Sequence, residues 1–167
     1  MSFDKIDPKV LAGEATDAHK SSGVKPTVRT VTFETEVADA AGDIKALFIV
    51  GAHEIPKAMR ILNDAIAGAT EIDVGLYRMD GTVVDVDALA DGLDISAGNA
   101  IGSPANGLGA LGIDEVKVKS FYDIANDVAT TDVVGHIPDD SYWVCLTLVS
   151  EVAAAGTINV ELETIGR

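Results

Sequence analysis

The chain has very little cysteine and few aromatic residues. Cys145 is its single cysteine, and aromatic side chains make up 5% of its 167 residues. One cysteine forms no internal disulfide and no paired-cysteine metal or redox motif. Apolar residues still make up 47% of the chain, so valine, isoleucine, leucine and alanine must fill the interior. This composition predicts one globular domain.

Long hydrophobic runs are absent as well. No stretch reaches the roughly 18 consecutive apolar residues that a membrane-spanning helix needs. The first residues, Met1-Ser2-Phe3-Asp4-Lys5, lack the basic region and apolar core of a secretory signal. Together with the lone cysteine, these absences predict synthesis in a reducing cytoplasm.

Positive charge is scarce. The chain has 12 lysines and arginines against 27 acids, which gives a net charge of −15. Residues 1–26 carry four lysines and four acids, so the whole imbalance lies in residues 27–167. An acidic body is repelled by phosphate backbones and by anionic lipids, which argues against nucleic-acid and membrane partners.

Patterns that resemble reactive motifs lack the neighbouring residues or elements that the chemistry needs. Gly107–Gly112 matches G-x-G-x-x-G, but a loop precedes it and a predicted strand follows, whereas a dinucleotide site needs a strand and then a helix. His53-Glu54 begins like a zinc-protease motif, but Lys57 stands where the second histidine belongs. Cys145 lies in an apolar strand, where a thiol behaves as a small hydrophobe.

The densest carboxylate group could suggest a calcium site. An EF-hand loop needs oxygen ligands at its positions 1, 3 and 5 and glycine at position 6. When the positions are counted from Asp85, Leu89 and Ala90 occupy positions 5 and 6, so the pattern fails. We expect helix capping and a solvated acidic face, with an adventitious cation as the open alternative. The four residues are Asp85, Asp87, Asp91 and Asp94. The sequence thus predicts no catalytic, cofactor-binding or metal site, no cofactor, and no enzyme.

Alternating apolar and polar residues predict a mainly β body. The expected strands include the alternation from Thr30 to Val37, the apolar run Ile44–Val50, Ala58–Asn63 and Glu71–Tyr77. Asp80-Gly81 predicts a hairpin turn. Val116 and Val118 mark one more short strand. Asp85–Leu93 and Phe121–Val128 are predicted as short helical segments, and Gly92–Gly112 as a loop.

The end of the body contains the clearest strand pattern. Tyr142–Val152 is apolar on both faces, whereas Thr157–Ile165 alternates with polar residues. The small residues from Ala153 to Gly156 join the two. We therefore predict a β-hairpin with one buried and one half-exposed strand. The whole pattern predicts an antiparallel β-sandwich, jelly-roll-like, over residues 27–167, with one or two short helices.

Residues 1–26 are predicted to form an extended N-terminal arm. Pro8, Gly13 and Pro26 interrupt any helix, and no strand alternation appears. Such an arm is either a disordered terminus or a strap that becomes ordered on a partner. The residue pattern leaves both possibilities open.

Three stretches resemble small structural proteins of tailed bacteriophages. They are Ala40-Ala41-Gly42-Asp43-Ile44 through Ile55-Pro56-Lys57-Ala58, then Ala69 to Tyr77, and the segment Ala155-Gly156-Thr157-Ile158-Asn159-Val160-Glu161-Leu162. The resemblance covers most of residues 30–165. It implies a capsid decoration, or cement, protein that is made in the cytoplasm of a bacterial host and lies on the outer surface of the virion head. Its partners would be the major capsid protein and itself, as a homotrimer.

In that interpretation the arm contacts the coat lattice. The candidate contact residues combine apolar anchors with lysines: Phe3, Lys5, Ile6, Lys9, Val10 and Leu11. Two alternatives stay open. One is a tail, connector or head-fibre base component. The other is a carbohydrate-binding jelly-roll module, which would need Tyr142 and Trp143 exposed for stacking on a sugar.

Overall fold

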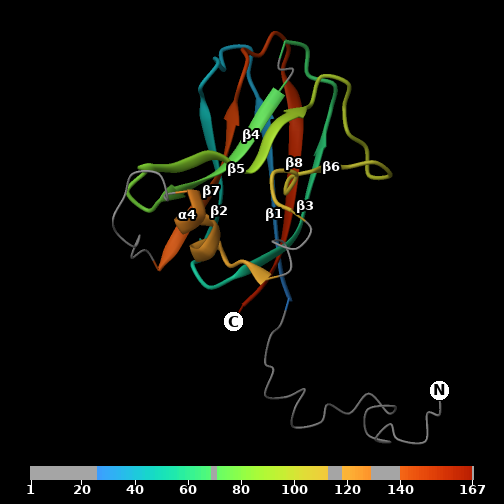
Figure 1. Ribbon diagram of the computed structural model, residues 1–167. Coiled ribbons are helices and arrows are strands. Elements are labelled where there is room, and N and C mark those ends of the chain that lie inside the picture. Colours follow the sequence, from blue (N-terminus) through green and yellow to red (C-terminus); the bar gives the residue numbers. More distant parts are fainter. Residues whose placement is uncertain (1–25, 69–70, 113–117, 129–139, 167) are drawn as a thin grey trace, which may run out of the picture.

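The protein is an eight-stranded sandwich with one helix in the part of the chain that the structure describes. The computed structural model describes residues 26–68, 71–112, 118–128 and 140–166 (Figure 1). The elements are β1 (Pro26–Thr35), β2 (Ile44–Gly51), β3 (Ile55–Asn63), β4 (Glu71–Arg78), β5 (Val83–Asp94), β6 (Ala105–Asn106), α4 (Phe121–Val128), β7 (Ser141–Leu148) and β8 (Gly156–Ile165). The predicted mainly β class is confirmed.

The strands form two antiparallel sheets. Sheet A has the order β1-β8-β3-β6, and sheet B has the order β2-β7-β4-β5. In Figure 1 the strands of sheet B lie to the left and those of sheet A to the right. Apart from the β4–β5 hairpin, each chain connection crosses from one sheet to the other. Two four-stranded sheets connected in this way are a jelly roll, so the predicted sandwich is confirmed in its more specific form.

The predicted C-terminal hairpin is wrong. β7 pairs with β2 and β4 in sheet B, while β8 pairs with β1 and β3 in sheet A. The link between them crosses the end of the sandwich, where the amide of Ala153 donates to the carbonyl of Ala67. The expected difference in burial is nevertheless confirmed, since β7 is mostly buried and β8 alternates.

The helix predicted over Asp85–Leu93 is also wrong, because these residues belong to β5. Ala88, Leu89 and Ala90 favour a helix in isolation, but pairing with β4 places all three in the core. The Asp80-Gly81 turn is confirmed. Gly81 has a φ of 86°, which favours glycine, and the amide of Arg78 donates to the carbonyl of Thr82.

Helix α4 closes one end of the sandwich and confirms the predicted helical turn. Ser120 caps it: the Ser120 amide donates to Asp123 Oδ2, and the Asp123 amide donates to Ser120 Oγ. Phe121, Ile124 and Ala125 are buried in the common core. Of the strand expected at Val116 and Val118, the first residue lies outside the described residues and the second lies in no strand.

The core lies between the inner faces of the two sheets. Sheet B supplies Tyr142, Leu146 and other alternate residues, and sheet A supplies alternate residues such as Ile158 and Leu162, all fully buried. Truncating such a residue to alanine typically costs about 2–5 kcal/mol. Because this alternation fixes which side chains point inward, it also fixes which ones each sheet presents outward.

Candidate interaction surface

The outer face of sheet B is a grid of three strands and three rows. The registers of β2, β7 and β4 place directly opposite residues in one row, on the same face of the sheet. The rows are Ile44–Thr147–Asp73, Ala46–Cys145–Gly75 and Ile49–Trp143–Tyr77. Most of these nine residues are apolar, and Asp73 is the only charged one. We call this grid the sheet B face.

Tyr77 spans the sheet B face. Its hydroxyl lies 3.0 Å from Thr147 Oγ1, which is two rows away, so its ring crosses the middle row. Cys145 lies in that row and is only 4% exposed. Burial raises the pKa of the Cys145 thiol to about 11. The expectation that this cysteine acts as a small hydrophobe agrees with its position, because a neutral buried thiol is a poor nucleophile.

Gly75 lets a bulge of β5 lie on the sheet B face. Between Val74 and Leu76 the partner strand advances from Ala90 to Asp85, so β5 carries extra residues there. A Cβ at Gly75 would lie 2.1 Å from the carbonyl oxygen of Asp85. The bulge therefore packs directly on the Gly75 backbone, and it presents the exposed side chain of Val86.

Exposed apolar side chains concentrate on sheet B. Of the ten large hydrophobic residues that are exposed among the described residues, six lie on its strands or directly after them, one lies on sheet A, and three, Val37, Ile101 and Val118, lie outside the strands. The six are Ile44, Ile49, Met79, Val83, Val86 and Val149, and the one is Val28. Isolated exposed hydrophobics are normal, but a concentration on one face marks an interaction site.

The outer face of sheet A is polar by contrast. Its polar side chains bond to one another across the strands: Asn159 Nδ2 donates to Thr32 Oγ1, and Thr157 Oγ1 donates to Glu34 Oε1. Arg60 forms an ion pair with Glu161. A face whose polar groups bond to each other and to water is stable when solvated.

The two sheets also differ in charge. The strands of sheet A carry three acids and three cations: Glu34, Glu161, Glu163, Arg29, Lys57 and Arg60. The strands of sheet B carry six acids and two cations: Glu71, Asp73, Asp85, Asp87, Asp91, Asp94, Lys45 and Arg78. Sheet B is therefore the acidic one.

Two of these acids flank Val86 on the bulge. Burial, with a further contribution from the neighbouring carboxylate of Asp87, raises the pKa of Asp85 to about 6. The predicted group Asp85, Asp87, Asp91 and Asp94 lies on one strand, and its members cap no helix. In the part of the chain that is described, no group of three or more histidine, cysteine and acidic residues is placed to hold a metal ion.

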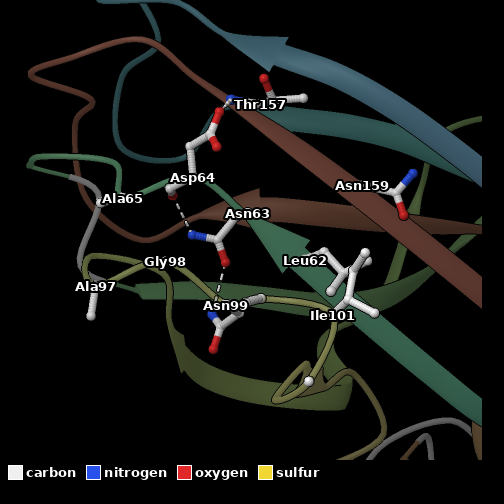
Figure 2. A pocket seen from close by; sticks show the side chains of 12 residues that line it. Leu62, Asn63, Asp64, Ala65, Ala97, Gly98, Asn99, Ile101, Thr157 and Asn159 are labelled. Atoms are coloured by element: carbon white, nitrogen blue, oxygen red, sulfur yellow. Dashed lines mark hydrogen bonds between the residues drawn. The ribbon is translucent and has the colours of Figure 1, made fainter.

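A groove of about 810 Å³ lies where β3 ends, against the 97–102 loop and β8 (Figure 2). Asn63 and Asn99 exchange two backbone hydrogen bonds, and Asn99 Nδ2 donates to Asn63 Oδ1. Asp64 Oδ2 accepts from the Thr157 amide. These bonds attach the loop to both strands, so the polar groups mainly hold the shape of the groove. Ile101, 88% exposed, lies at its rim.

An ion pair anchors the start of β1, next to the predicted arm. Nη1 and Nη2 of Arg29 each donate to a carboxylate oxygen of Glu54 at 2.8 Å, and the Thr164 hydroxyl also donates to Glu54. Burial alone would raise the pKa of Glu54, but these hydrogen bonds outweigh it and hold that pKa below its usual value. The contact ties β1 to β8 and to the β2–β3 turn.

The predicted contact residues of the arm cannot be placed. Phe3, Lys5, Ile6, Lys9, Val10 and Leu11 all lie outside the described residues, and so do His19 and His136. β1 begins at Pro26, the last residue of the predicted arm. The division between arm and body stays a prediction.

The aromatic pair proposed for sugar stacking is not on one surface. Tyr142 is fully buried in the core, whereas Trp143 is partly exposed on the sheet B face. Sequence reasoning missed this face, although one signal was present: Tyr142–Leu148 and Ile44–Val50 are apolar on both sides, and only one side of each reaches the core. No helix among the described residues is long and apolar enough to cross a membrane.

Solved structures share this fold. The chain is similar to one in the capsid of Ralstonia phage GP4, with a TM-score of 0.55 and 17% identity over 84% of this chain and 85% of that one. It is also similar to a chain in the capsid asymmetric unit of cyanophage Pam1, with a TM-score of 0.53 and 11% identity over 86% of each chain. No protein-family model and no curated protein sequence matches the chain.

Proposed function

We propose that this chain is a structural protein of a tailed-phage virion that binds the outer surface of the head and stabilises the coat lattice. One observation carries the proposal: the jelly roll is shared, over more than four fifths of the chain, with chains in two phage capsids. A jelly roll hosts many functions, so the particular surface must agree with the role. A concentrated apolar face on an acidic body agrees with a binding role.

The chemistry favours adhesion over catalysis. The buried thiol of Cys145 is a poor nucleophile. The carboxyl of Asp85, whose pKa is raised, lies on the bulge of β5 beside the exposed Val86. The net charge of −15 keeps the protein soluble when many copies are crowded on one shell. Weak contacts repeated over a lattice also stabilise an assembly beyond the affinity of any single contact.

The arm is proposed to act as the strap. Its apolar and basic residues, from Phe3 to Leu11, would lie along neighbouring coat subunits, and the copies of the chain would associate as a homotrimer. Any load on the arm would reach β1 at Pro26. The Arg29–Glu54–Thr164 contact, three residues further on, would transmit that load to β8 and β3.

Deleting residues 1–25 tests this role. We expect the truncated protein to keep its β-rich circular dichroism spectrum and its cooperative unfolding, because β1 begins at Pro26. Attachment to heads that lack the protein should be lost or strongly weakened in co-sedimentation. Attachment of the truncated protein at full occupancy would contradict the strap.

Copy number separates the head role from the alternative of a tail, connector or head-fibre base component. A decoration protein is present in numbers comparable with the coat protein, whereas the alternatives form a small ring or a few fibres. Quantitative mass spectrometry of purified particles measures this ratio. A ratio far below that of the coat protein would favour the alternative.

A further inference from the structure

The sheet B face presents apolar side chains along β2 that the described part of the chain leaves exposed. Ile44 is 49% exposed and Ile49 is 46% exposed, both on the edge strand β2. Trp143, which is partly exposed, continues the row of Ile49 across β7, whereas Tyr77, only 3% exposed, ends that row on β4. Aromatic and branched aliphatic residues placed together in this way resemble the central part of a protein interface, where burial contributes most of the affinity.

The surroundings of this face are acidic. Asp43 directly precedes Ile44, and Asp85 and Asp87 flank the exposed Val86 on the bulge. Lys45, at the same edge, is already paired with Asp39 at 2.6 Å. A partner that buries the apolar centre must therefore bring positive charge to the rim, since like charges placed opposite each other oppose binding.

We propose that the sheet B face docks on a coat-protein surface with an apolar centre and a rim of lysine or arginine residues. The inference rests on the proposed attachment to phage heads and assigns the surface of the body that makes it. The strap and the sheet B face are then two separate contacts with the same lattice. Linking two contacts in one chain raises the overall affinity without any change in either contact.

A second copy of this chain fits the same face less well. Two copies meeting through their sheet B faces would bring Asp85, Asp87 and Asp43 of each toward the same interface. Sheet B carries six acids against two cations, so its charge is complementary to a basic surface and not to itself. The proposed partner is therefore a different, basic surface.

One double variant and one single control variant, both in the full-length chain, test the proposal. Ile44→Ser with Ile49→Ser removes the apolar centre on β2, and Val28→Ser is the matched control on β1. Val28 is 58% exposed and also lies on an edge strand, but on sheet A. Co-sedimentation with heads that lack the protein, titrated over concentration, measures the affinity of each variant. Thermal unfolding monitors whether each variant is folded.

We expect the double variant to bind at least about tenfold more weakly and the Val28→Ser control to stay within about twofold of the wild type. Asp85→Asn with Asp87→Asn should slow association and reduce its dependence on salt, because rim charges act mainly on encounter. Both results would support the surface and the chemistry assigned to its partner.

Other outcomes separate the two levels of the proposal. Wild-type protein that does not sediment with heads overturns the proposed function. Wild-type protein that sediments, with a folded double variant that binds equally well, overturns the sheet B assignment alone. If the double variant instead changes the oligomeric state of the free protein in analytical ultracentrifugation, the face joins copies of this chain, and the coat-docking inference is overturned.

Discussion

The two outer faces of this sandwich both belong to four-stranded antiparallel sheets, yet they differ in chemistry. The face of sheet A is covered by threonine, asparagine and charged residues that bond across the strands. The sheet B face is apolar, and a bulge of β5 lies on its backbone. A jelly roll needs only its inner faces to be apolar, so the apolar outer face reflects a requirement beyond folding.

The largest expected effect comes from replacing Gly75, on whose backbone the β5 bulge packs. In Gly75→Ala the new Cβ would meet the backbone of Asp85 and Val86, which cannot rotate away as a side chain can. We expect a loss of about 2–4 kcal/mol in the free energy of unfolding, measured by chemical denaturation. Gly102→Ala is the control, because no atom lies within 4 Å of a Cβ there. Equal stability of both variants would refute the close contact.

The second test concerns the hydrogen-bonded ion pair near the start of β1. Glu54→Gln should cost about 1–2 kcal/mol, because it weakens a charge-assisted, part-buried contact with Arg29 and Thr164. The lowered pKa of Glu54 means that its contribution is present above about the usual value of 4.5 and is lost as the pH falls through the folded-state value.

Its control is Glu161→Gln, which removes the more exposed ion pair with Arg60. That variant should change stability by less than about 0.5 kcal/mol. Thermal unfolding at pH 7 and at pH 3 compares the two. If Glu54→Gln is no less stable than Glu161→Gln at pH 7, the anchor of β1 makes no special contribution.

The smallest expected effect lies at the rim of the sheet B face. The raised pKa of Asp85 means that its charge opposes folding at neutral pH. This cost is absent below the usual value of 3.8, grows as the pH rises toward about 6, and is constant above that. Asp85→Asn should therefore be more stable than the wild type at pH 7, by less than about 1 kcal/mol for a partly exposed group.

The difference should disappear near pH 4, where the wild-type carboxyl is already largely protonated. Asp91→Asn serves as the control, since Asp91 is an exposed acid on the same strand. Melting temperatures at the two pH values measure the effect. A gain for Asp85→Asn that is the same at both pH values would mean that the charge is not its cause.

Much of the fold was predictable from local pattern. The strands at Ile44–Val50, Ala58–Asn63 and Glu71–Tyr77, the Asp80-Gly81 turn and the helix from Phe121 were predicted from periodicity and turn chemistry. The wrong predictions, the Asp85–Leu93 helix and the C-terminal hairpin, share one cause: pairing between strands decides the structure, and local sequence does not show it. Ala88-Leu89-Ala90 favours a helix locally, and only the ladder with β4 makes it a strand. The candidate surface was missed because it joins residues distant in sequence, such as Ile49, Tyr77 and Trp143.

Composition and alternating hydrophobicity are local properties of the chain, and they were enough to specify an acidic, β-rich domain. The assignment of β7 and β8 to different sheets depends instead on long-range pairing. Two consecutive strands have the same local pattern whether they pair with each other or across a sandwich, and the choice depends on backbone hydrogen bonds to β2, β4, β1 and β3. That partition also placed six of the ten exposed large hydrophobic residues of the described chain on sheet B or directly after its strands.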